Sequence, residues 1–79
     1  MEKNTTLLAH LPMKTKAKIV SIYGGHHFNR KMCIMNIREG QIIEVVSKQP
    51  FRGPLTIAIG NSKLTIGRGM AHRIKVEII

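Results

Sequence analysis

The sequence lacks the means for covalent cross-linking and for crossing a membrane. It contains one cysteine, Cys33, so no internal disulfide can form, which argues against a small secreted scaffold and for a reducing compartment. The longest uninterrupted apolar run is Met32–Met35, far shorter than the roughly 20 residues of a membrane-spanning helix. The stretch MEKNTTLLAHLPMK has no apolar segment of signal-peptide length. We therefore expect a cytoplasmic protein without membrane insertion.

Acidic residues are scarce. The chain has 13 Lys and Arg against 4 Asp and Glu, all of them Glu, for a formal net charge of +9. Such a charge attracts polyanions and anionic surfaces. The basic residues are dispersed, however, and no run of five marks a nucleic-acid-binding arm. Solvation and diffuse steering therefore explain the charge better than a dedicated nucleic-acid surface does.

The same scarcity of carboxylates argues against an enzyme. No pairing of carboxylates for acid–base chemistry is visible among the glutamates. Cys33 could act as a nucleophile with His26 or His27 as its base, but the sequence supplies no third, orienting group. The segment Gly67–Gly69 is too short for a phosphate-binding loop and lacks the Gly-Lys-Ser/Thr ending. We expect no catalytic residues and no enzymatic activity.

The sequence does contain a series of short β-branched segments within one expected domain, residues 1–79, with Met1–Lys3 expected to be frayed. Thr5 and Thr6 suggest a helical turn that threonine caps and Pro12 ends. Beyond it, alternating apolar residues predict strands and a 3.6-residue period predicts one helix. The expected strands are Lys16–Tyr23, Gln41–Ser47, Pro54–Ile59, a segment carrying Leu64 and Ile66, and Arg73–Ile78, and the expected helix is His27–Met35.

The first of these strands has an irregular pattern. Ala17 and Ile19 share one face, but Ile22 falls out of the two-residue register. A β-bulge near Val20 or Ser21 would bring all three apolar side chains to the core.

The expected helix has one apolar stripe. Phe28, Met32 and Met35 follow the spacing i, i+4 and i+7, so these side chains should face the core. Asn36 suits the left-handed position that ends many helices, and Gly40 should close the following turn. The methionines are thus interpreted as core residues and not as metal ligands.

Five short strands at close spacing predict a mainly β fold, a small partly open barrel with one short α-helix between strands 1 and 2. The ordered series of motifs also resembles the FeoA family, the small ferrous-iron transport protein A with its SH3-like barrel. The resemblance covers nearly the whole chain. It is carried by Leu11-Pro12, Ala17, Ile19, Ile22, Gly24-Gly25, Lys31, Met32, Met35, Asn36, Ile37, Gly40, Ile43, Val45, Gly53-Pro54-Leu55, Ile57 and LTIGRGMAHRIKV from Leu64 to Val76.

The resemblance implies a role in ferrous-iron uptake and iron homeostasis. The implied partner is the membrane transporter FeoB, whose cytoplasmic portion includes a GTP-hydrolysing domain. Members of the family are thought of as accessory or regulatory proteins and not as catalysts. Similar barrels form the C-terminal domain of iron-dependent repressors, but the residues before the expected barrel predict no helix-turn-helix, so we do not expect a whole repressor.

Three positions depart from the family pattern. Lys14 and Asn36 occupy places where the family usually has glycine, and Ile34 occupies one that is often polar. Asn tolerates a positive φ, and we expect Lys14 to adopt an ordinary turn conformation.

Histidine and cysteine are the candidate metal ligands, and transition-metal binding through His26, His27 and Cys33 is one open hypothesis. Their spacing matches neither Cys-x-x-Cys nor His-x-x-x-His pairs. A ferrous site would usually add a carboxylate, and Glu39, the nearest, lies across the helix end. We expect no cofactor, because this spacing does not support Fe²⁺ or Zn²⁺ binding. The full set of candidates is His10, His26, His27, Cys33 and His72.

Protein–protein interaction is the function that the residues favour, and two surfaces are candidates. On the outer flank of the helix, Arg30, Cys33 and Ile34 lie at neighbouring angles; the alternative is that Ile34 packs under the N-terminal leucines. In the loop Gln49–Pro54, Phe51 and Arg52 could project from a Pro- and Gly-bounded turn; the alternative is that Phe51 caps one end of the barrel.

The leading hypothesis is an accessory protein of ferrous-iron uptake that binds the cytoplasmic part of a FeoB-type transporter. The alternatives are a nucleic-acid-binding SH3-like barrel and a metal-sensing regulator that uses His26, His27 and Cys33. Nucleic acid is the disfavoured partner, because the sequence has only three aromatic residues that could stack on bases, Tyr23, Phe28 and Phe51. Homo-oligomerisation stays open.

Overall fold

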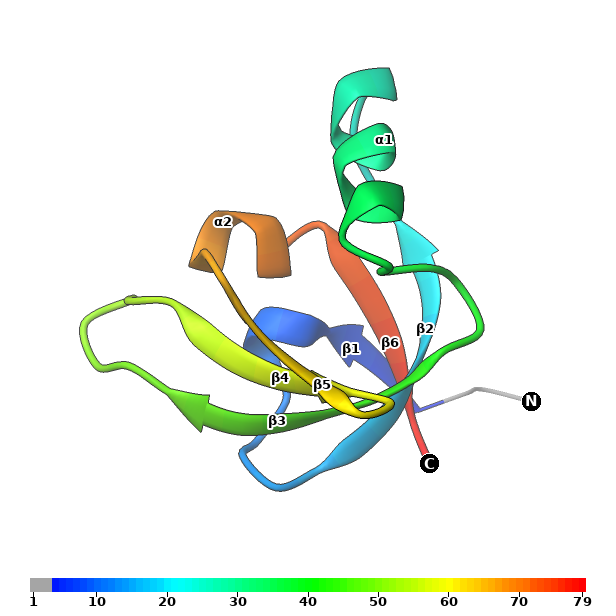
Figure 1. Ribbon diagram of the computed structural model, residues 1–79. Helices are drawn as coiled ribbons and strands as arrows, with labels where there is room; N and C mark the ends of the chain where they lie inside the picture. Colours follow the sequence, from blue (N-terminus) through cyan, green and yellow to red (C-terminus); the bar gives the residue numbers. More distant parts are fainter. Residues whose placement is uncertain (1–3) are drawn as a thin grey trace.

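The computed structural model describes residues 4–79, which form one antiparallel sheet of six strands with short helices at its ends (Figure 1). The prediction that Met1–Lys3 are frayed lies outside the described residues. In chain order the elements are β1 (Thr5–Leu7), the 3₁₀-helix η1 (Leu8–His10), β2 (Lys16–Ile22), α1 (His26–Ile34), β3 (Ile42–Lys48), β4 (Leu55–Ile59), β5 (Ser62–Ile66), α2 (Arg68–Ala71) and β6 (Ile74–Ile78).

The strand order is β1-β6-β2-β3-β4-β5, so β1 and β5 are the two edges and the sheet is not closed. The prediction of a mainly β fold is confirmed. The predicted number of strands, five, was wrong, and so was the predicted position of the helix between strands 1 and 2. Residues Thr5–Leu7 pair with β6 and add a strand at the N-terminus, so α1 lies between β2 and β3. The predicted threonine cap is also wrong, because Leu7 precedes η1 and no side chain caps it.

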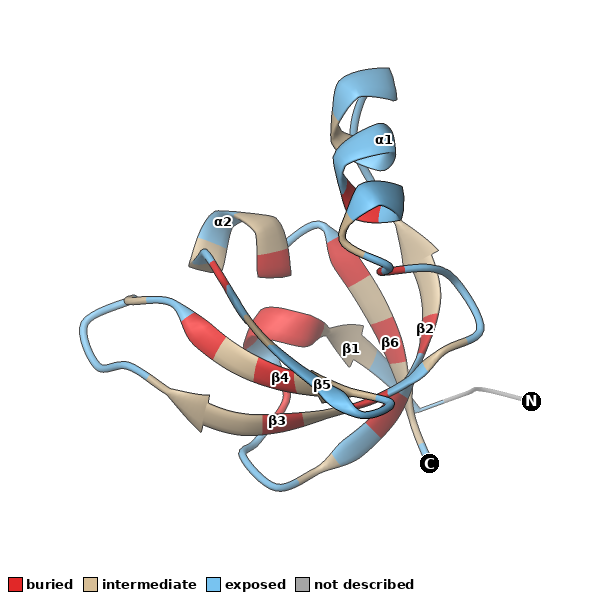
Figure 2. Ribbon diagram, in the orientation of Figure 1, coloured by how far each residue is buried: buried red, intermediate tan, exposed pale blue. Residues whose placement is uncertain are grey.

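The core is formed mainly by inward-facing side chains of the curled sheet, and η1, α1 and α2 each add one or two buried residues. Figure 2 shows buried positions alternating with partly exposed ones along β4 and β6. This is the two-residue period that the sequence predicted. The buried apolar residues are Leu8, Ala9, Leu11, Ala17, Ile19, Met32, Ile37, Ile43, Val45, Leu55, Ile57, Ile66, Ala71, Ile74 and Val76.

Two β-bulges bend the sheet. The pairing of β2 with β6 shifts register between Ile19 and Ser21, which confirms the predicted bulge; Ala17 and Ile19 are buried and Ile22 packs against the core. A second shift, between Val45 and Ser47 in β3, has no counterpart in the predictions. Because a bulge increases local twist, the two shifts help the strands wrap around the small core.

Four residues other than glycine have a positive φ: Lys14, Asn36, Phe51 and Arg52. Asn36, at +64°, confirms the predicted left-handed end of α1. The expectation of an ordinary turn at Lys14 was wrong, since its φ is also +64°. The Lys14 amide donates a 2.7 Å hydrogen bond to the Val45 carbonyl, and this contact with β3 holds the turn in that conformation.

Candidate functional site

Helix α1 projects from the sheet and is attached at its C-terminal end (Figure 1). Of the residues in α1, Met32 alone is buried. The Ile37 amide donates a 2.8 Å hydrogen bond to the Met32 carbonyl, which ties the end of the helix to the following segment. The predicted stripe is confirmed, because Phe28 and Met35 pack against the core beside Met32. The rest of the helix surface is exposed.

The outer flank of α1 carries the first predicted surface. Arg30, Cys33 and Ile34 are all exposed, and Ile34 exposes 76% of its surface. The alternative that Ile34 packs under the N-terminal leucines was therefore wrong. Beside this flank lies a shallow pocket of about 360 Å³. It is lined by Ile22, Asn29, Cys33, Ile37, Arg38 and Glu39.

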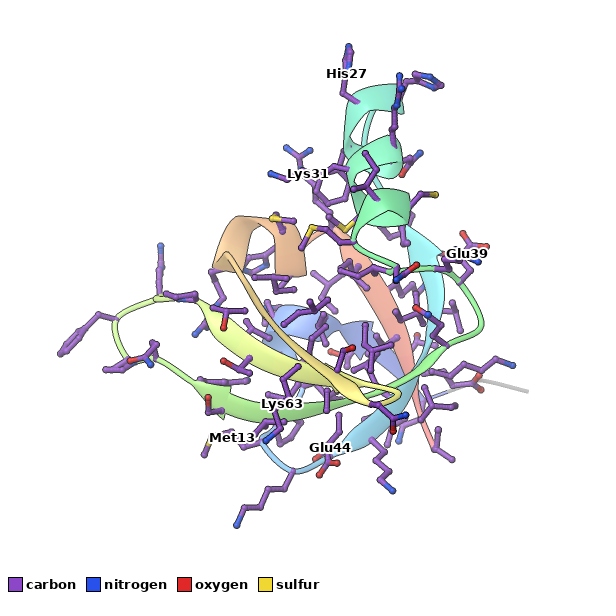
Figure 3. The ribbon with its side chains drawn as sticks, viewed as in Figure 1. Met13, His27, Lys31, Glu39, Glu44 and Lys63 are labelled. Atoms are coloured by element: carbon purple, nitrogen blue, oxygen red, sulfur yellow. The ribbon has the colours of Figure 1, made fainter. Side chains whose placement is uncertain are left out.

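The predicted metal ligands do not converge. The His26 and His27 rings are 6.4 Å apart between centroids at the outer end of α1. Cys33 lies seven residues beyond His26, which is about 10 Å along the helix axis at 1.5 Å per residue. Figure 3 places His27 at the outer end of the helix and Glu39 beyond its other end. Within residues 4–79 no three His, Cys, Asp or Glu side chains are grouped closely enough to hold a metal ion.

The loop between β3 and β4 carries the second predicted surface. The Gln49 amide donates to the Pro54 carbonyl at 3.0 Å, and the Gly53 amide donates to the Pro50 carbonyl at 3.1 Å. At the tip Phe51 is 99% exposed, so the alternative that it caps the barrel was wrong. Phe51 and Arg52 have φ values of +58° and +61°, a conformation that is costly for side chains of this size.

A basic pocket that the sequence did not indicate lies between this loop, η1 and α2. Its lining is His10, Arg52, Arg68 and His72, and its volume is about 350 Å³. His10 and His72, which the sequence offered as separate metal candidates, meet edge to face with ring centroids 5.3 Å apart. No local pattern could have revealed this pocket, because its members come from three separate segments of the chain, namely η1, the β3–β4 loop and α2 with its C-terminal cap.

Lys48 borders the same region. Its ammonium donates a 3.3 Å hydrogen bond to the carbonyl of Ala9, the neighbour of His10. Burial, with a further contribution from the positive charge of Arg68, lowers the pKa of Lys48 below its ordinary value. Both effects disfavour the charged form of the amine.

None of the helices within residues 4–79 combines the length and the apolar character needed to cross a bilayer.

Comparison with known proteins identifies the relatives of this fold. The family model described as FeoA domain matches residues 6–78. A crystal structure described as an iron uptake regulatory protein (FeoA) superposes with a TM-score of 0.88 at 31% sequence identity, covering 95% of this chain and 99% of that one. The solution structure of a FeoA-like protein from Clostridium acetobutylicum superposes with a TM-score of 0.86 at 26% identity, covering 100% and 91%. These matches support the SH3-like small β fold.

A manganese-dependent transcriptional repressor shares the fold as well. Its TM-score is 0.90 over 100% of this chain and 44% of the repressor, at 16% identity. At that identity the likeness concerns the fold alone. No curated protein sequence matched the chain.

Proposed function

Because the chain belongs to the FeoA family, we propose that it is an accessory protein of ferrous-iron uptake that binds the cytoplasmic part of a FeoB-type transporter. The observation that carries this proposal is the family match across residues 6–78. It is supported by the similar structure described as an iron uptake regulatory protein. On this proposal the chain works in the cytoplasm by binding and not by catalysis, and ferrous iron is the cargo of its partner.

The outer flank of α1 is the part of the surface best suited to this contact. Ile34 is the most exposed aliphatic side chain of the described residues, at 76%. Covering apolar surface stabilises a complex by roughly 25 cal/mol per Å², and Arg30 and the adjoining pocket supply the polar rim that interfaces commonly have. Phe51 and Arg52 form a second contact candidate at the β3–β4 loop.

A binding measurement with a matched pair of variants tests the contact. The purified cytoplasmic part of the FeoB-type transporter from the same organism is titrated with the full chain by calorimetry. We expect Ile34→Glu to weaken binding at least about tenfold, because it places a charge in the buried centre of the interface. Ile79→Glu is the control, since Ile79 is 72% exposed but lies at the C-terminus, and it should change the affinity less than about twofold.

The outcomes separate the partner from the surface. Equal weakening by both variants would contradict the α1 surface and point to a general charge effect. Absence of binding by the unmodified chain would contradict the transporter as partner.

A cellular measurement tests the role in iron uptake. Deleting the gene should lower ferrous-iron uptake under anaerobic conditions, and the unmodified chain should restore it better than Ile34→Glu. Unchanged uptake in the deletion strain across low and high iron would count against the accessory role.

A further inference from the structure

The basic pocket defined by His10, Arg52, Arg68 and His72 has the composition of an anion site. Each lining side chain carries, or can gain, a positive charge, and none is a carboxylate. The glutamates in the described part of the chain are Glu39, Glu44 and Glu77, on other elements. A pocket with two guanidinium groups and no anionic ligand repels metal cations and attracts oxyanions.

Arg68 is held in place before any ligand arrives. Its Nε donates to the Gly53 carbonyl at 3.1 Å, and its Nη2 donates to the Gln49 carbonyl at 3.3 Å. A guanidinium has five N–H donors, so three remain after these two bonds. The β3–β4 loop thereby fixes a planar donor group at the pocket, and fixing it in advance lowers the entropy cost of binding.

The same loop positions Arg52. Arg52 lines the pocket while the preceding residue, Phe51, projects into solvent, and both have left-handed backbone conformations. Such conformations are unfavourable for non-glycine residues and are often retained at functional sites. The bonds of Arg68 to Gln49 and Gly53 bracket these two residues, so the two arginines are structurally linked.

We propose that this pocket binds a phosphate group. A phosphate offers several acceptor oxygens and up to two negative charges, which suits two arginines and two imidazoles better than a singly charged ligand does. Bound phosphate would also offset the repulsion between Lys48 and Arg68. The phosphate could belong to a free phosphate compound or to a lipid headgroup, and the exposed Phe51 beside the pocket provides a way to distinguish them. This site is separate from the α1 surface and does not depend on transporter binding.

A titration of inorganic phosphate tests the pocket directly. The ¹⁵N-labelled full chain is titrated at about pH 7, where a phosphate group carries on average more than one negative charge. Ionic strength is held constant with chloride, because screening alone changes surface electrostatics. We expect saturable one-to-one shifts of the His10 and His72 ring resonances and of Arg68 Nε–H. Linear shifts without saturation, or equal shifts over the whole surface, would overturn the proposal.

Charge-matched variants separate the pocket from the general positive charge. Arg52→Gln should weaken phosphate binding about tenfold, because it removes a charge-assisted donor. Lys63→Gln removes the same charge from exposed β5, at a site away from the pocket, and should change binding less than about twofold. Equal effects of the two variants would overturn the proposal.

Arg68→Gln is a second test, with unfolding followed in urea because Arg68 also holds the loop. A folded Arg68→Gln variant that binds phosphate as well as the unmodified chain would also overturn the proposal.

A vesicle measurement identifies the source of the phosphate. Cosedimentation uses phosphatidylcholine vesicles with and without phosphatidic acid. If the headgroup is the ligand, phosphatidic acid should increase binding, Phe51→Ala and Arg52→Gln should both reduce it, and Phe51→Ala should leave the inorganic phosphate titration unchanged. Saturable inorganic phosphate binding without phosphatidic acid binding would assign the pocket to a free phosphate compound.

Discussion

At the scale of single residues, the two adjacent glycines before α1 have different roles. Gly24 has a φ of +155°, and a Cβ atom there would lie 2.7 Å from the Phe28 ring. Phe28 also contacts the Arg73 guanidinium, which lies 5.0 Å from its ring centroid. A Cβ atom at Gly25 would meet nothing within 4 Å beyond its chain neighbours. The sequence alone does not distinguish the two glycines.

Substitution of each glycine by alanine should therefore give different results. We expect Gly24→Ala to lower the free energy of unfolding by about 1–3 kcal/mol, the usual cost of overpacking, with backbone strain in addition. Gly25→Ala should change it by less than about 0.5 kcal/mol, because its φ of −75° suits any residue. Urea unfolding of both variants checks this, and equal losses would contradict the role given to Phe28.

At the scale of elements, α1 depends on its tertiary contact. It is 9 residues long and no side chain caps its N-terminus. Isolated helices shorter than about 12–15 residues are marginal in water. Its stability must come from burial of Met32, with Phe28 and Met35 packed alongside.

Truncation of the buried methionine should release the helix. Met32→Ala should destabilise the protein by about 2–5 kcal/mol, and amide hydrogen exchange should accelerate more in α1 than in the sheet. Ile34→Ala is the matched control on the exposed flank and should cost less than about 0.5 kcal/mol. Exchange in α1 that is unchanged in Met32→Ala would show that the helix is held by other contacts.

At the scale of the whole molecule, charge is the dominant feature. The net charge of +9 on 79 residues opposes compaction, because like charges repel more strongly when the chain is folded. The basic pocket concentrates part of this charge at one end of the sheet. Screening should therefore stabilise the folded state.

A salt series measures this effect. Raising sodium chloride from about 20 mM to about 200 mM should shorten the Debye length and raise Tm by roughly 2–5 °C. The shift should be smaller in Lys63→Glu, which lowers the net charge by two without touching the core. A Tm that stays constant or falls with salt would mean that attractive charge pairs dominate.

Features that depend on local periodicity could be predicted from the amino-acid sequence. Ile43 and Val45 face the core because side chains alternate along a strand. The bulge in β2 could be predicted because Ile22 falls out of the two-residue register of the strand. Asn36 marks the end of α1 because asparagine tolerates a positive φ. The motif series also led to the FeoA family.

Features that depend on partners distant in the chain emerged with the tertiary structure. Thr5–Leu7 is a strand because β6, at the other end of the sequence, supplies its hydrogen bonds, and Lys14 adopts a positive φ because Val45 accepts its amide hydrogen bond. The basic pocket arises because the fold brings η1, the β3–β4 loop and α2 together. Short-range patterns carry no information about such pairings, since they depend on which segments the curled sheet makes neighbours.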